Sequence, residues 1–273
     1  MKKQGILTRL APDRSVALAQ YRGRAGVYDL ELAPFEPIRR RAVAQLALRP
    51  DDAVLDVGCG TGLSFPLLLG RVGRGGRIVG IEQSPEMIER ARQRVAQQGW
   101  GNVSLVCAPV EAAEIPLLAD AALFHFTHDI LQQPEAIANV LRHLKPGARV
   151  VASGLKWAGP WRWPTNLFVL PAALRSVSSL EGLAAPWAGL AKAIPNLDVR
   201  STLMGGVFVA SGTLPMPAEE ETAPSSPRLR LAGRAGPLAR PFVAVRARAQ
   251  APRGAQGVWG GPAGTGMEGL LRR

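Results

Sequence analysis

The chain has 273 residues, of which 47% are hydrophobic and 20% are charged, so it can form one large domain or two small ones with a packed core. Its formal net charge of +12 would by itself suggest a nucleic-acid-binding protein. However, residues 225–273 contain nine arginines and one acid, which account for +8 of that charge. The rest of the chain carries a net charge of only about +4, so residues 1–224 are not strongly basic.

Cysteine content and the N-terminal residues bear on the compartment. The two cysteines, Cys59 and Cys107, are too few for a disulfide framework and fit a reducing compartment. Charges return by Arg9, before the apolar core of a signal peptide could form. No uncharged apolar run reaches the roughly 18–20 residues that span a bilayer. We therefore expect a cytoplasmic protein without a transmembrane segment.

The first regular element is a helix. Residues 37–48 carry apolar side chains at a helical period, preceded by Pro34 and followed by Pro50. Residues 54–62 then read V-L-D-V-G-C-G-T-G. The apolar run at 53–57 predicts a strand that is buried on both faces, as in a parallel sheet. The alternating glycines permit an abrupt strand-to-helix turn that a ligand can approach closely.

The spacing of these glycines excludes two common phosphate-binding turns. A P-loop would continue with Gly-Lys-Ser/Thr, and a dinucleotide-binding turn would read G-x-G-x-x-G. Neither pattern occurs at residues 58–62.

Alternating strands and helices continue to the end of the predicted fold. Further strands are expected at residues 77–81, 103–107, 120–126 and 149–153, and further helices at 63–69, 85–98, 134–144 and 187–194. Residues 197–204 and 207–211 predict two more strands joined by a Gly205-Gly206 turn. We expect an α/β fold with a doubly wound, mostly parallel seven-stranded sheet, an antiparallel closing hairpin, and a site at the carboxyl ends of the parallel strands.

The turn at 54–62 resembles the first motif of the class I S-adenosylmethionine (SAM)-dependent methyltransferases at every position. The L-K-P-G sequence at 144–147 also recurs in that superfamily. Residues 25–30 and 60–66 are closest in character to quinone-biosynthesis and phospholipid N-methyltransferases. The resemblance covers about residues 16–215 and implies a Rossmann-like methyltransferase fold that uses S-adenosyl-L-methionine.

The resemblance also implies the cofactor residues. Asp56 is expected under the turn near the ammonium of the methionine moiety, and Glu82 is expected to hold both ribose hydroxyls. Pro109 stands where relatives have an adenine-binding Asp, so Val110 or Glu111 is expected to contact the adenine instead. The expected cofactor set, with no metal, is Asp56, Gly58, Cys59, Gly60, Gly62, Glu82, Gln83, Met87, Val110 and Glu111.

The acceptor side is less determined. His125 and His128 follow the fourth strand and are candidate bases for a hydroxyl or carbon acceptor, although an amine acceptor needs no base and both rings could be structural. Nucleic-acid base methylation is not expected, because Phe126-Thr127-His128 replaces the Asn/Asp-Pro-Pro-Tyr/Phe motif of such enzymes.

Aromatic residues in two segments are candidate substrate contacts. In the resembling groups a Tyr-x(n)-Tyr-Asp segment forms a lid, which would place Tyr21 and Tyr28 over the site; packing of both rings on the core is the alternative. Trp157 and Trp161 are candidates for an apolar pocket, or for the core or an interface. We expect a small-molecule or lipid-like acceptor and no nucleic acid, with peripheral membrane contact left open.

These expectations divide the chain into a lid segment at 1–34, a methyltransferase domain at 35–216 and a tail at 217–273. The tail lacks periodicity and is rich in Pro, Gly, Ala and Arg, which favours a disordered basic extension or a product of out-of-frame translation. A third interpretation is that it contacts nucleic acid or anionic lipid. The alternative function is therefore a catalytically inactive SAM-binding regulator with a nucleic-acid-contacting tail.

Overall fold

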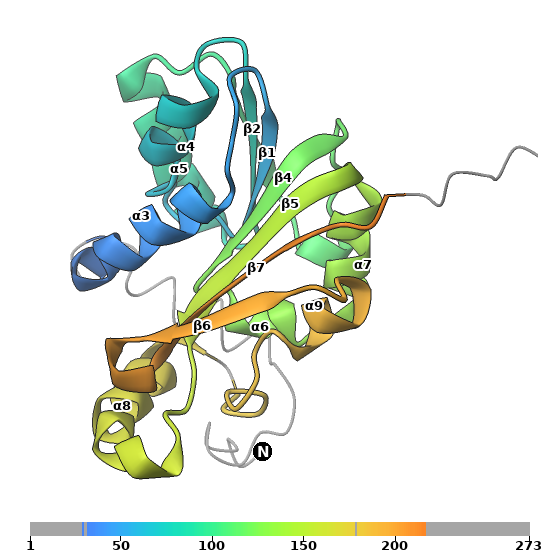
Figure 1. The fold of residues 1–273 in the computed structure, drawn as a ribbon. Helices are drawn as coiled ribbons and strands as arrows, with labels where there is room; N and C mark the ends of the chain where they lie inside the picture. The colour runs from blue at the N-terminus through green and yellow to red at the C-terminus, as the bar shows by residue number, and fades with distance from the viewer. Residues whose placement is uncertain (1–28, 30–31, 178, 217–273) are drawn as a thin grey trace, which may run out of the picture. The chain divides into compact units, whose positions relative to one another are not determined.

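The computed structural model of the chain describes residues 29, 32–177 and 179–216 (Figure 1). Tyr21 and Tyr28, and the expected tail at 217–273, lie outside these residues. Within the described part, no helix combines the length and the apolar character that crossing a bilayer requires.

Seven strands form one sheet in the order β3-β2-β1-β4-β5-β7-β6, which confirms the predicted fold class (Figure 1). The strands are β1 (Ala53–Val57), β2 (Arg77–Glu82), β3 (Val103–Cys107), β4 (Ala119–His125), β5 (Leu144–Leu155), β6 (Asp198–Thr202) and β7 (Val207–Thr213). The first five pair in parallel, whereas β7 runs antiparallel to both β5 and β6. The chain reverses its direction of travel across the sheet between β1 and β4, which is where ligands bind in open α/β sheets.

Helices cover both faces of the sheet. The α-helices are α3 (Glu36–Gln45), α4 (Phe65–Val72), α5 (Pro85–Gln98), α6 (His128–Leu131), α7 (Pro134–Arg142), α8 (Asn166–Ser176) and α9 (Ala188–Ala193), and the 3-10 helices are η2 (Ala33–Phe35), η3 (Val110–Ala112), η4 (Pro160–Thr165) and η5 (Leu203–Gly205). One apolar layer joins the sheet to α3, α4 and α5, and the other joins it to α7 and α9. Val54 lies in the first layer and Leu55 in the second, so β1 is buried on both faces as predicted.

Helix α5 begins and ends as its sequence predicts. The Ser84 hydroxyl accepts a hydrogen bond from the Met87 N–H at 3.3 Å, and Pro85 occupies the first turn. Gly99 ends the helix in a left-handed conformation, with φ of 64°. These signals fix where β2 ends and α5 begins, and hence the position of Glu82 at the end of the strand.

Several predicted boundaries are wrong. Helix α3 ends at Gln45 instead of residue 48, and α7 ends at Arg142 instead of residue 144. Helix α4 runs over Phe65–Val72 instead of 63–69, because Pro66 suits a first helical turn and Gly73 ends the helix with φ of 70°. Strand β5 begins at Leu144 instead of residue 149, and its pairing with β4 shifts register between Ala119 and Ala121. The hairpin turn is longer than predicted, because η5 precedes Gly206.

Gly80 in β2 lets the sheet, the glycine turn and α4 approach one another closely. An added Cβ would lie 2.9 Å from Cys59 Sγ, 2.9 Å from Phe65 Cζ and 3.0 Å from Leu105 Cδ2.

We expect Gly80→Ala to lower the free energy of unfolding by about 1–3 kcal/mol through overpacking, as measured by urea denaturation. Gly101→Ala is the matched control, because no atom lies within 4 Å of its added Cβ. Equal stability of the two variants would contradict this close packing.

Candidate active site

A cavity opens to solvent at the carboxyl ends of the parallel strands, and its empty space, open solvent included, is about 690 Å³. Seven of the ten predicted cofactor residues line it, namely Gly58, Gly60, Glu82, Gln83, Met87, Val110 and Glu111. Asp56 and Cys59 line a smaller cavity of about 290 Å³ that shares Gly58 with the first. Gly62 lines neither cavity: an added Cβ there would lie 2.4 Å from the Phe65 ring, so this glycine permits close packing of α4.

The turn after β1 depends on glycine for its shape. Gly58 and Gly60 have φ of 69° and 56°, in the left-handed region that side chains rarely adopt. An added Cβ on Gly58 would lie 2.5 Å from Thr127 Cγ2, so the turn also lies close to the segment after β4. The main chain of the turn is therefore the surface that a ligand would meet.

Glu82 connects this turn to the end of β2. Its Oε2 accepts a hydrogen bond from the Gly60 N–H at 3.1 Å, and its Oε1 accepts one from the Ser84 N–H at 2.8 Å. Burial raises the pKa of this carboxyl, and the backbone N–H groups oppose the rise. Each carboxylate oxygen retains a second lone pair. Glu82 is thus held in place with capacity to accept further hydrogen bonds, such as those from two ribose hydroxyls.

The segment that carries Pro109 is held by a residue that sequence reasoning missed. Asn139, buried on α7, donates hydrogen bonds from Nδ2 to the carbonyls of Val110 and Ala113, at 2.7 and 2.9 Å. These bonds fix η3 at the rim of the large cavity. The signal available in the sequence was an amide residue on the apolar face of the predicted helix at 134–144.

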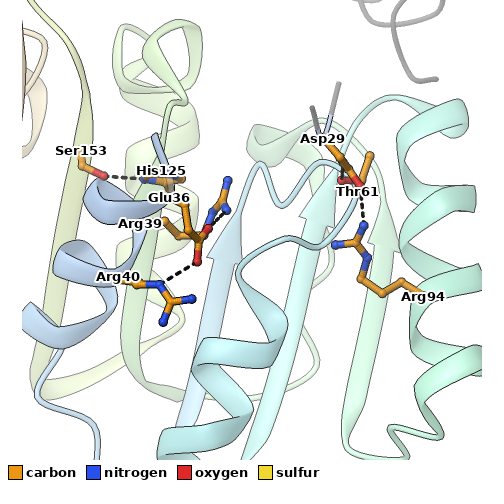
Figure 2. Close-up of polar contacts among 8 residues, drawn as sticks. All are labelled: Asp29, Glu36, Arg39, Arg40, Thr61, Arg94, His125 and Ser153. Atoms are coloured by element: carbon orange, nitrogen blue, oxygen red, sulfur yellow. Dashed lines mark hydrogen bonds and ion pairs between the residues drawn. The ribbon is translucent and has the colours of Figure 1, made fainter. Parts of the chain in front are cut away.

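Three unpartnered polar atoms surround the smaller cavity. Arg39 Nε, Asp56 Oδ2 and His125 Nε2 are all buried and have no hydrogen-bond partner among the described residues. They come from α3, β1 and β4, and Figure 2 shows Arg39 beside His125. Arg39 also forms an ion pair with Glu36, and His125 Nδ1 lies 2.7 Å from Ser153 Oγ. Buried polar atoms are seldom left unpaired, so this chamber fits a ligand that carries both an ammonium and a carboxylate.

Burial changes the protonation of this chamber. The pKa of Asp56 is raised to about 7 by desolvation, against which Arg39 acts, while Glu82 adds to the rise. The pKa of His125 is lowered to about 3, first by desolvation and then by Arg39. His125 is consequently neutral and a very weak base near pH 7, a property that does not favour it as a general base.

His128 lies at the junction of the large cavity with a third one. Its Nε2 is 2.8 Å from the Glu181 carbonyl oxygen, which can only accept, so Nε2 carries the proton. Its Nδ1 is buried and has no partner among the described residues. Burial lowers the pKa of His128, while Asp129 and the Glu181 carbonyl act in the opposite direction. The neutral ring therefore retains a basic lone pair on Nδ1.

The third cavity is small and largely apolar. It is lined by Phe126, His128, Leu131, Ser153, Gly154, Leu155, Ser176, Val177 and Phe208. Neither predicted tryptophan lines it: Trp157 packs against the core, and Trp161 is 96% exposed. The two predicted histidines are thus separated, with His125 at the polar chamber and His128 at the apolar cavity.

Asp29, which precedes α3 in the chain, contacts both the glycine turn and α5. Its Oδ1 accepts a hydrogen bond from Thr61 Oγ1 at 2.6 Å, and its Oδ2 forms an ion pair with Arg94 of α5 (Figure 2). Asp29 belongs to the segment at 1–34 that the sequence predicts as a lid, and its contacts reach the glycine turn and α5.

Comparison with known proteins agrees with this geometry. A family model described as a methyltransferase domain matches residues 54–147, from β1 into β5. Over 170 residues the chain is 30% identical to aklanonic acid methyltransferase DauC of Streptomyces sp. (strain C5), covering 60% of this chain and 74% of DauC. The chain belongs to the class I SAM-dependent methyltransferases.

Other methyltransferases match more briefly. The C-methyltransferase UbiE of ubiquinone and menaquinone biosynthesis from Geotalea daltonii is 31% identical over 118 residues, which are 41% of this chain and 49% of UbiE. The chain spans about half or less of the length of several curated relatives that it matches, UbiE included. In structure, the N-methyltransferase NodS of Bradyrhizobium japonicum WM9 in complex with S-adenosyl-L-homocysteine (SAH) aligns with a TM-score of 0.53 at 18% identity, over 73% of this chain and 98% of NodS, which shows a shared fold.

The methyltransferase family uses SAM, and the residues of this site fit it. The chamber at Arg39 and Asp56 suits the carboxylate and ammonium of the methionine moiety, Glu82 suits the ribose, and η3 lies where the adenine is expected. When bound, SAM supplies a methyl group activated by a sulfonium. Of the site residues, Arg39 was not predicted from sequence, although it is a charged residue among Ile38, Ala42 and Val43 on the apolar side of α3.

The pKa of Asp56 predicts a pH dependence of ligand binding. An ammonium group binds the ionised carboxylate, and with a pKa of about 7 only about a tenth of Asp56 is ionised at pH 6. We therefore expect the Kd of SAH, measured by calorimetry, to be about tenfold higher at pH 6 than at pH 8, with proton release on binding below pH 7. Asp56→Asn should bind weakly with no such dependence. A wild-type Kd that is the same at both pH values would rule out this role for Asp56.

The contacts of Asp29 with Arg94 and with Thr61 of the glycine turn predict that this link supports ligand binding. We expect Arg94→Ala to weaken SAH binding by about threefold to fivefold, because a partly exposed ion pair contributes up to about 1 kcal/mol. Arg92→Ala is the matched control, since Arg92 lies on the same helix and pairs only with exposed Glu89. If the two variants bind SAH equally well, this link does not contribute to the cofactor site.

Proposed function

We propose that the protein transfers a methyl group from SAM to an oxygen or carbon atom of a small, largely apolar molecule. The observation that carries this proposal is that two cavities meet at Phe126, His128 and Ser176. The large cavity is lined by the expected cofactor residues, and the third cavity, lined in part by Leu155 and Val177, is mostly apolar. A methyl donor in the first cavity and an acceptor in the second would thus face each other across these shared residues.

The composition of the apolar cavity supports an uncharged acceptor. Among the described residues that line it, none is Asp, Glu, Lys or Arg. A cationic amine would lack a carboxylate partner there, and an anionic group would lack a cation. The hydroxyls of Ser153 and Ser176 and the ring of His128 leave the cavity able to orient a hydroxyl or carbonyl group. DauC and UbiE, which the chain matches, carry aklanonic acid and quinones in their names.

Methyl transfer from a sulfonium is an in-line displacement, so the main work of the protein is positioning and exclusion of water. A hydroxyl or acidic carbon must also lose a proton. His128 is the better placed of the two predicted bases, because it borders both cavities and its Nδ1 has no hydrogen-bond partner among the described residues. His125 instead serves the polar chamber and orients Ser153 through its Nδ1.

No described residue favours the alternative of an inactive SAM-binding regulator. Its support rested on Pro109 and on the tail at 217–273, and the tail lies outside the described residues. Pro109 itself begins η3, whose Val110 and Glu111 still line the large cavity.

Binding of SAH to the full-length protein is the first test. We expect Glu82→Ala to raise the Kd of SAH at least tenfold, a loss of roughly 1.4 kcal/mol, because it removes the acceptor for the ribose and for the Gly60 and Ser84 N–H groups. Glu89→Ala, on the exposed side of α5, should bind SAH as the wild type does. Unchanged binding by Glu82→Ala would remove the basis for the cofactor site.

Incorporation of labelled methyl groups from SAM into a panel of phenols, quinols and enols would then test the acceptor class. Amines and amino lipids form the comparison panel. Turnover confined to the amine panel would overturn the proposed acceptor chemistry while leaving the cofactor site intact.

A further inference from the structure

Six large apolar side chains project into solvent at one end of α8. Their exposed fractions range from 52% to 96%, and they are six of the eight exposed large hydrophobic residues in the described part of the chain. We call them the aromatic patch: Trp161 and Trp163 of η4, Leu167 and Phe168 of α8, and Leu203 and Met204 of η5. Such a cluster is unusual on a surface that faces only water.

The patch is held together by contacts between segments that are about 40 residues apart in sequence. Thr165 Oγ1 donates a hydrogen bond to the Met204 carbonyl at 3.4 Å. The backbone at Gly206 lies so close to α8 that an added Cβ would be 2.9 Å from Thr165 and from Val169. Figure 1 shows the connection between β6 and β7 beside α8. The exposed side chains thus sit on a packed base.

The surroundings of the patch are cationic. Arg162 lies between the two exposed tryptophans and is itself exposed. Lys156 lies before η4 and donates hydrogen bonds to the carbonyls of Trp157 and Gly205. No Asp or Glu occurs at residues 136–180 or 199–218. The segments that build the patch therefore carry positive charge without an acid of their own.

We propose that the aromatic patch docks the protein on an anionic lipid bilayer. Tryptophan is enriched where membranes meet water, because its ring is apolar and its N–H polar, and nearby Arg and Lys are attracted to anionic headgroups. The patch combines both features. The apolar side chains would enter the boundary between headgroups and acyl chains, and Arg162 would stay at the level of the phosphates.

Charge argues against two other occupants. A second copy in a two-fold dimer would bring the patch against itself, so that cations would meet cations with no acid between them. The N-terminal residues 1–28 contain six Lys or Arg and one acid, so they also lack charge complementarity with the patch. An anionic surface is the occupant that complements it.

Docking would bring the apolar cavity near the lipid. Helix α8 carries Leu167 and Phe168 near its start and ends at Ser176, which lines both the large cavity and the apolar one. Its 11 residues span about 16 Å at a rise of about 1.5 Å per residue. A bilayer at the patch would therefore lie within about two nanometres of the site where the acceptor is expected.

The test is co-sedimentation of the full-length protein with vesicles of phosphatidylcholine, with and without phosphatidylglycerol. We expect stronger binding to the anionic vesicles. Trp161→Ser/Phe168→Ser should lower the partition coefficient at least tenfold. Arg162→Gln should lower it about fivefold, which corresponds to about 1 kcal/mol for one basic residue at a membrane surface. The basic residues at 225–273 are present in every variant, so these differences report the patch alone.

Leu118→Ser is the matched control, because Leu118 is 55% exposed and precedes the amino end of β4, at the other end of the sheet from the cavities. It should bind vesicles like the wild type. Equal vesicle binding by wild type and Trp161→Ser/Phe168→Ser would overturn the proposal, as would no preference for anionic vesicles. A dimer that the double variant converts to a monomer in lipid-free sedimentation velocity would show that a second copy is the occupant. SAH calorimetry on each variant checks folding, and Arg162→Gln against Leu118→Ser decides the matter if the double variant fails to fold.

Discussion

The hydrogen bond between Glu82 and the Gly60 N–H is the constraint on which the site depends, because it joins a turn that only glycine can form to the end of the neighbouring strand. Gly58, Gly60 and Gly62 all have positive φ within five residues, a conformation that exposes main-chain amides. Without an acceptor, a buried N–H would cost about 1–3 kcal/mol. Glu82 satisfies this N–H and that of Ser84, and so sets both the turn and the start of α5.

The same site holds polar atoms that the fold does not satisfy. Arg39, Asp56 and His125 each have one buried polar atom without a partner among the described residues, and each comes from a different element. Leaving such atoms unpaired costs stability, which is the usual sign of a binding function. Burial also shifts the pKa values of two of these groups, because desolvation is the largest cause of both the raised pKa of Asp56 and the lowered pKa of His125. A ligand that carries its own charges would remove the mismatch.

Most of the residues that the sequence predicts for the cofactor line one cavity, because the signals that identify them are local in the chain. The glycine spacing, the acid at the end of β2 and the Ser84 cap all lie within 31 residues of chain, at 54–84, and each has a backbone reason for its residue type. Arg39 and Asn139 were missed, because their roles arise only when α3 and α7 pack against the sheet. In sequence they are single polar residues within amphipathic helices, a pattern that most often indicates a solvated position.

The proposed acceptor cavity could not be predicted in this way, because it is formed by segments with little local sequence pattern. The cavity is formed by Phe126 after β4, by α6, by the ends of β5 and α8 and by Phe208 of β7, which are far apart in the chain. Tryptophans near position 160 were predicted to line a substrate pocket. In the structure Trp161 is exposed to solvent, and the apolar cavity is lined instead by residues that include Phe126, Leu155 and Val177. An exposed cluster of large apolar side chains usually marks an interaction site. We therefore infer two roles for the residues between β5 and β6. One end of α8 lines the apolar cavity and the other carries Leu167 and Phe168 of the aromatic patch, so the proposed acceptor site and the proposed bilayer contact share one helix.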